Sequence, residues 1–92
     1  MATEIYAGRQ MLYHAAHLRD SGKVVSREAA MVKLFCTEMA CRVADNAVQI
    51  HGGMGYMNET FVSRYYRDSR LLSIGGGTDE VMREILSKLE GF

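Results

Sequence analysis

The sequence predicts an all-α protein, specifically part of an up-down four-helix bundle. Three observations support this class: the 92 residues contain no proline, their apolar residues recur at helical spacing, and glycines gather where helices must end. A chain of this length forms at most one domain, with a modest core. Six of the nine glycines fall in two clusters, residues 52–55 and 75–77.

The first two predicted helices are the long ones. Helical spacing of small and apolar residues covers residues 1–19, and Gly22 suits the left-handed conformation that closes a helix. Ser26 is predicted to cap the second helix, which continues to His51 and stops at Gly52. Its many small residues would let a partner helix approach closely.

Two shorter helices follow. Asn58 and Glu59 are predicted to cap a third helix that ends near Arg70, and an apolar connector, residues 71–74, leads into the second glycine cluster. Thr78 is predicted to cap the last helix. Its apolar stripe comprises Val81, Ile85 and Leu89, and Gly91 ends it. These helices are too short to cover the longer ones, so we expect apolar surface to remain exposed unless another domain or subunit covers it.

Composition argues against several classes of function. The chain has 11 basic and 11 acidic residues and a formal net charge of zero, so electrostatic binding to nucleic acid or a membrane surface is not expected. No stretch approaches the ~18 apolar residues of a membrane span, and a secreted protein is not expected. Cys36 and Cys41 are expected to be buried small residues in a reducing compartment. His14 and His17 lack a third ligand, so no metal site is predicted.

The two glycine clusters differ in polarity. The first follows the C-terminal end of a helix, so it is not a phosphate loop, which precedes a helix N-terminus. A plain helix stop and the close approach of a flat group, with Gln49 beside it, both remain open. The second cluster precedes a helix, but Asp79 and Glu80 would repel a lone phosphate. Their carboxylates either accept hydrogen bonds from ribose hydroxyls or adenine, or simply stabilise the helix.

A row of arginines lies between the two clusters. Arg64, Arg67 and Arg70 share one helix face, and Asp68 is placed to pair with Arg64. A salt-bridged face is the favoured interpretation over a ligand site. No Ser/His/Asp or Cys/His nucleophile set is present, so residue spacing alone names no reaction.

Three motifs, in order, closely resemble the C-terminal helical domain of acyl-CoA dehydrogenases. They are residues 47–56 (AVQIHGGMGY), residues 64–70 (RYYRDSR) and residues 74–81 (IGGGTDEV). Residues 1–4 and 28–35 are similar to the preceding helices of that bundle, so the resemblance covers essentially the whole chain. It implies that residues 1–92 form an incomplete copy of this domain, without the upstream domains.

The resemblance also implies a cofactor and a reaction. The family consists of FAD enzymes, usually homotetramers, that remove two hydrogens across the α,β carbons of an acyl-CoA and pass electrons to an electron-transferring flavoprotein. It implies that one FAD-contacting segment, from a neighbouring subunit, comprises Gln49, Ile50, His51, Gly52 and Gly53. A second comprises Thr78, Asp79 and Glu80, while Gly76 and Gly77 would line the thioester end of the substrate pocket.

One position departs from the common family pattern. Many members carry their catalytic glutamate in a Tyr-Glu-Gly-Thr sequence, and Gly76 stands in the place of that glutamate. The pattern is similar to the long-chain and isovaleryl-type branch, in which the base comes from an earlier helix, here upstream of Met1. The resemblance therefore implies that this chain holds no catalytic residue.

We therefore expect a fragment of an FAD-dependent acyl-CoA dehydrogenase that is inert alone. It is expected to form a homo-oligomer, in a bacterial cytoplasm or a mitochondrial matrix and not secreted. The alternative is a non-enzymatic helical interaction or oligomerisation module derived from the same scaffold.

Overall fold

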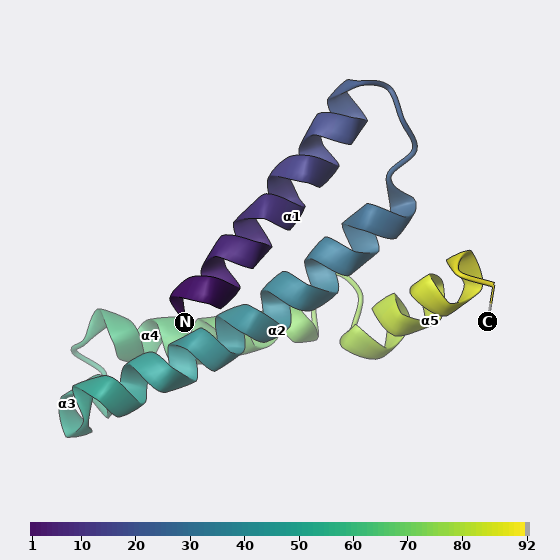
Figure 1. Cartoon of the computed structure of the whole chain (residues 1–92). Coiled ribbons are helices and arrows are strands. Elements are labelled where there is room, and N and C mark those ends of the chain that lie inside the picture. The colour runs from purple at the N-terminus through teal and green to yellow at the C-terminus, as the bar shows by residue number, and fades with distance from the viewer. Residues whose placement is uncertain (92) are drawn as a thin grey trace.

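The computed structural model describes residues 1–91, and its secondary structure over that range is entirely helical (Figure 1). The helices are α1 (Ala2–Asp20), α2 (Ser26–His51), α3 (Gly53–Tyr56), α4 (Phe61–Ser69), the 3-10 helix η1 (Arg70–Ser73) and α5 (Asp79–Leu89). This confirms the all-α prediction. None of the described helices combines the length and the apolar character that crossing a membrane requires.

The long helix α2 is the centre of the fold. It contacts α1, α3, α4, η1 and α5. Figure 1 shows α1 and α2 as an antiparallel pair, with α4 beside the C-terminal half of α2. Ion pairs between Arg83 and Glu38 and between Arg27 and Glu90 join α5 to the N-terminal half of α2.

Most of the buried apolar residues that surround α2 are small. The buried apolar residues of the described chain are Ala15, Ala30, Ala44 and Met82. Gly8 is also buried, and a Cβ added there would lie 2.9 Å from Met39 Cε and 3.2 Å from Cys36 Sγ. Small side chains thus let α1 approach α2 closely.

Many large apolar side chains remain outside this core. Tyr6 on α1 is 67% exposed, Tyr56 in α3 is 79% exposed, and Phe61 on α4 is 69% exposed. The expectation of exposed apolar surface is therefore confirmed. The expectation that both cysteines are buried is wrong, because Cys36 and Cys41 are half-buried at the contacts of α2 with α1 and α4. Partial burial still raises the pKa of the Cys36 thiol above its ordinary value.

Some helix boundaries agree with the sequence prediction. Gly22 has a φ of +82°, the left-handed conformation expected after the first helix. Thr78 caps α5, because its Oγ1 accepts a hydrogen bond from the Val81 amide at 3.2 Å. Both features depend on a few adjacent residues, which is why the local sequence specifies them.

Other boundaries differ from the prediction. Val25, not Ser26, occupies the N-cap of α2, and no side chain caps that end. Thr60 caps α4 in place of Asn58 and Glu59, its Oγ1 accepting from the Ser63 amide at 3.4 Å. The apolar connector after α4 is also ordered, as the 3-10 helix η1.

The first glycine cluster forms a helical turn, α3, that the sequence pattern did not predict. Gly52 takes a φ of +66° between α2 and α3 and so reverses the chain. Gly55 is buried against the end of α2, where an added Cβ would lie 2.8 Å from Val48 O and 2.8 Å from His51 Cβ. A side chain at Gly55 would therefore push α3 off α2.

Replacing Gly8 with leucine is expected to lower the free energy of unfolding by about 1 to 3 kcal/mol, because the new side chain overpacks the α1–α2 contact. Urea unfolding followed by circular dichroism measures this. Ala16→Leu is the matched control, since Ala16 is exposed on the same helix and its effect should stay within about 0.5 kcal/mol. Equal effects of the two substitutions would contradict the close contact.

Candidate functional site

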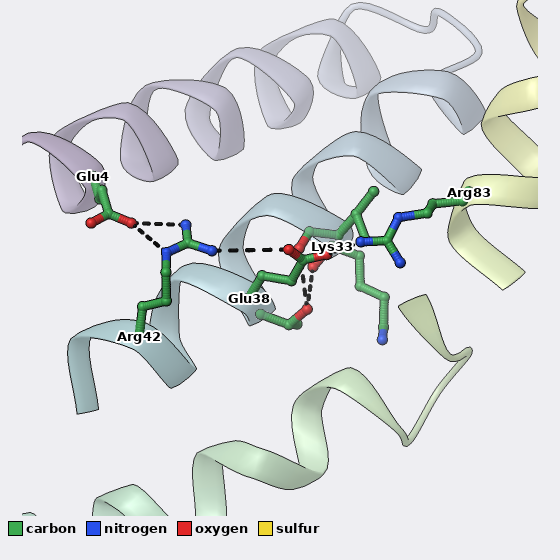
Figure 2. A network of polar contacts seen from close by, with 7 residues as sticks. Glu4, Lys33, Glu38, Arg42 and Arg83 are labelled. Atoms are coloured by element: carbon green, nitrogen blue, oxygen red, sulfur yellow. Dashed lines mark hydrogen bonds and ion pairs between the residues drawn. The ribbon is translucent and has the colours of Figure 1, made fainter. Parts of the chain in front are cut away.

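A chain of charged residues links three helices near the middle of α2 (Figure 2). Arg42 Nη2 lies 2.8 Å from Glu4 Oε2 of α1, and its Nη1 lies 3.9 Å from Glu38 Oε2. Arg83 Nη2 of α5 lies 2.6 Å from Glu38 Oε1. These side chains are partly exposed, so each pair contributes at most about 1 kcal/mol. They connect α1 and α5 to the same stretch of α2.

The first predicted flavin segment lies at the C-terminal end of α2. Gln49, Ile50, His51, Gly52 and Gly53 are all exposed. A Cβ added at Gly52 or Gly53 would meet no atom within 4 Å. The structure therefore presents this segment as open surface rather than as a plain contact between helices.

The imidazole of His51 has a defined orientation. Its Nδ1 lies 2.8 Å from the carbonyl oxygen of Ala47, one turn earlier on α2. A carbonyl oxygen only accepts hydrogen bonds, so Nδ1 carries a proton in this contact. In the neutral ring, Nε2 is then left as an acceptor at the exposed end of the helix.

The second glycine cluster is a tight loop between η1 and α5. Gly76 and Gly77 have φ values of +71° and +107°, which side-chain-bearing residues rarely adopt. The space around the missing Cβ of Gly76 is open, whereas a Cβ at Gly77 would lie 2.6 Å from Met82 Cε. Gly76 thus faces free space while Gly77 is packed on α5.

The loop is also held from α2. Lys33 Nζ donates hydrogen bonds to the carbonyl oxygen of Leu72, at 2.9 Å, and to that of Gly77. The sequence pattern did not single out Lys33, because a lysine within a helix ordinarily indicates a solvent-exposed face. Its carbonyl partners are defined by the packing of η1 on α2, which residue spacing does not reveal.

Asp79 follows the loop as the first residue of α5. It is half-buried, and its Oδ1 is shielded from solvent without a hydrogen-bond partner among residues 1–91. Leaving a buried acceptor unpaired costs about 1 to 3 kcal/mol. Glu80, its neighbour, is exposed. A donor from outside the described chain would therefore stabilise Asp79.

The two predicted segments do not meet in one chain. Lys33 marks where the second glycine loop contacts α2. Gln49 lies about 24 Å farther along that helix, at 1.5 Å per residue. Thr78, Asp79 and Glu80 are thus grouped with Gly76 and Gly77, while the segment at the end of α2 is separate.

A hollow of about 1290 Å³ lies elsewhere, between α2, α3, α4 and η1. Its lining includes Asp45, Tyr56, Tyr66, Arg67 and Arg70, and none of the predicted flavin or substrate residues. Arg67 and Arg70 of the arginine row are the sequence feature that points to this hollow.

The arginine row is not salt-bridged as predicted. Arg64 donates to the carbonyl oxygen of Asn58 at 3.3 Å, and the expected pair with Asp68 is absent from the described residues. Arg67 and Asp68 instead line the hollow beside α4. Within residues 1–91 no group of three His, Cys, Asp or Glu side chains is arranged to hold a metal ion.

Comparison with known proteins gives one consistent result. Residues 1–89 match the family described as "Acyl-CoA dehydrogenase, C-terminal domain". The probable acyl-CoA dehydrogenase YngJ of Bacillus subtilis is 48% identical over 88 residues, which are 96% of this chain and 23% of YngJ. Subunit CarC of the caffeyl-CoA reductase-Etf complex of Acetobacterium woodii is 41% identical over 87 residues, 95% of this chain and 23% of CarC.

The structural comparison agrees. Butyryl-CoA dehydrogenase from Megasphaera elsdenii superposes with a TM-score of 0.96 at 36% identity, over 100% of this chain and 24% of that one. This chain thus spans about a quarter of the length of these relatives.

The cap beneath the second loop gives a test of its geometry. Thr78→Ala should lower the free energy of unfolding by about 1 kcal/mol, because the first turn of α5 loses its side-chain acceptor. Thr78→Ser keeps the hydroxyl, so its free energy of unfolding should stay close to that of the original protein. Thr3→Ala, at an exposed position in α1, is the control in the same urea titration. An equal loss in the two alanine variants would contradict the cap.

Proposed function

Because this chain belongs to the acyl-CoA dehydrogenase family, as its C-terminal domain, we propose that it is part of an FAD-dependent acyl-CoA dehydrogenase. That enzyme would remove two hydrogens from the α,β carbons of an acyl-CoA thioester. This part would supply flavin contacts and subunit interface but no catalytic base. The second glycine loop carries the proposal, since it combines an open position at Gly76 with a capped helix start at Thr78.

The exposed end of α2 has the properties that a flavin contact needs. Nothing lies within 4 Å of an added Cβ at Gly52 or Gly53, so a flat group could approach the backbone there. The Gln49 amide and the free ring nitrogen of His51 offer hydrogen bonds beside it. These observations support FAD contacts by residues Gln49, Ile50, His51, Gly52 and Gly53.

The start of α5 suits a second flavin contact. The unpartnered Oδ1 of Asp79 could accept a hydrogen bond from a hydroxyl or N–H group of the ligand. Thr78 and Glu80 flank it. These residues would hold FAD, which would supply the hydride acceptor for the β-carbon of the substrate. The distance of about 24 Å along α2 between the two segments supports assigning the first segment to the flavin of a neighbouring subunit.

Gly76 and Gly77 are proposed to face the thioester end of the substrate. The loop offers no carboxylate at Gly76 to remove the α-proton, so the base would come from an upstream helix. The free space at Gly76 supports this, because it leaves room for a side chain from elsewhere. Assignment to the long-chain and isovaleryl-type branch rests on Gly76 alone, since overall similarity extends to a butyryl-CoA dehydrogenase as well.

The partners follow from the same proposal. Acyl-CoA would be the substrate, and an electron-transferring flavoprotein would accept the electrons. The relative CarC, a subunit of a caffeyl-CoA reductase-Etf complex, supports this partner. The two free cysteines are compatible with a bacterial cytoplasm or a mitochondrial matrix. The exposed apolar side chains support a homo-oligomer.

A second candidate function is a helical interaction module without catalysis. The absence of a carboxylate at Gly76 and the incompletely covered helices favour it. The two candidates differ in whether this chain supports flavin binding when it is joined to the rest of a dehydrogenase.

A chimera tests the proposed function. The host is a relative with Tyr-Glu-Gly-Thr at the second glycine loop, and this chain replaces its last quarter. The chimera should retain flavin absorbance but dehydrogenate acyl-CoA poorly, because Gly76 supplies no base. Although a side chain at the positive φ of Gly76 is strained, Gly76→Glu should still raise turnover by about 100-fold, which is at the low end of the typical contribution of a general base.

Three controls accompany the chimera. Gly75→Glu should not restore turnover, because its carboxylate stands one residue away from the required position. This 92-residue chain mixed with FAD, acyl-CoA and an electron-accepting dye should show no turnover above buffer. A folded chimera without flavin would contradict the proposal and favour the interaction module. Full turnover with Gly76 in place would contradict the inference that this chain supplies no base.

Self-association is the expected consequence of the exposed apolar surface. Sedimentation equilibrium at increasing protein concentration should give a weight-average mass above that of one chain, because association removes apolar side chains from water. Circular dichroism on the same samples confirms that the helices are intact. A strictly monomeric, well-folded chain at every concentration would contradict this expectation.

A further inference from the structure

Lys33 connects the two ends of the second glycine loop. Its ammonium group donates to the carbonyl oxygen of Leu72, in η1, and to that of Gly77, the last glycine of the loop. The residues between these two carbonyls include Gly75 and Gly76. One cation on the rigid helix α2 therefore bridges the loop from entry to exit.

No ordinary ion pair explains this lysine. Among residues 1–91, no carboxylate lies within salt-bridge distance of Lys33, whereas Arg27, Arg42, Arg83 and Lys88 all have acidic partners. Hydrogen bonds from a charged donor are shorter and stronger than neutral ones. Its two carbonyl partners are thus the principal interactions of this charge within the described structure.

The loop needs such a restraint because of its composition. Three consecutive glycines have more backbone freedom than any other tripeptide, and folding must restrict it. Gly76 and Gly77 both take positive φ values, and the neighbouring hydrogen bonds run from the Ile74 and Gly75 amides to Leu71 O. Glycines have no side chains that could hold the loop in this backbone conformation.

We propose that Lys33 is the positioning residue of the second glycine loop. Its ammonium group fixes the backbone of Gly76 and Gly77 so that Gly76 keeps its open face and Thr78 can cap α5. The role toward substrate rests on the proposed function. The ordering of the loop does not, because it follows from contacts within this chain alone.

Hydrogen–deuterium exchange on the whole chain tests the proposal without flavin or acyl-CoA. Lys33→Met keeps the length of the side chain but removes the ammonium group. Amide exchange at Ile74 and Gly75 should become faster by about tenfold, while the interior of α1 and α2 exchanges as before. Lys33→Arg, which restores a charged donor, should recover most of the protection. Lys88→Met is the matched control, since Lys88 is exposed and remote from the loop.

Each result decides the question. The proposal would be overturned if the amides of the loop exchanged at the original rate in a folded Lys33→Met protein. It would also be overturned if these amides were equally protected in Lys33→Met and in Lys33→Arg. If Lys33→Met loses its helical signal, Lys33→Gln takes its place and should show partial protection of the loop. If amide exchange became faster in every helix, or if Lys33→Met and Lys33→Gln both lost their helices, Lys33 would be needed for the whole fold and the proposal would be overturned. A chimera that lacks flavin would contradict the proposed function and leave the exchange result intact.

Discussion

The close approach of other helices to α2 is the constraint on which this fold depends. Gly8 of α1 and the buried Ala30 and Ala44 of α2 have small side chains or none, so neighbouring helices can approach α2 closely. Dispersion contacts at such short separations compensate for the small area that each residue buries. The larger side chain of Met39 lies against Gly8, whereas aromatic residues such as Tyr6 and Phe61 remain on the surface.

This arrangement also determines where functional residues can lie. Every element contacts α2, so each glycine cluster occupies its own position along one rigid helix. The first cluster reverses the chain at the end of α2, and the second is held near Lys33. A helix keeps such positions at a fixed separation, and one chain therefore presents two separate surfaces rather than one pocket. Functional use of both surfaces requires ligands or chains that reach them separately.

Local sequence predicted the features that local physics determines. Helical spacing identified the long helices, and the Thr78 cap and the Gly22 turn involve neighbours within four residues. Features that depend on packing were missed. The pairing of Arg64 with the Asn58 carbonyl in place of Asp68 follows from the turn before α4, and the contacts of Lys33 follow from the path of η1 along α2. Residue spacing within one helix holds no information about either.

Asp79 and Gly76 together fit the proposal that this chain works with additional elements. Asp79 holds an acceptor that is shielded from solvent and unpaired within residues 1–91, and Gly76 leaves space open beside it in the chain. A shielded acceptor is stable when a donor reaches it, and a proton-abstracting group is absent from the loop. The missing donor to Asp79 and the missing carboxylate at Gly76 both lie at the N-terminal end of α5, where Lys33 and Thr78 hold the backbone in place. The chain thus provides a fixed frame at this point, and under the proposed function the donor and the base would come from the groups that bind against it.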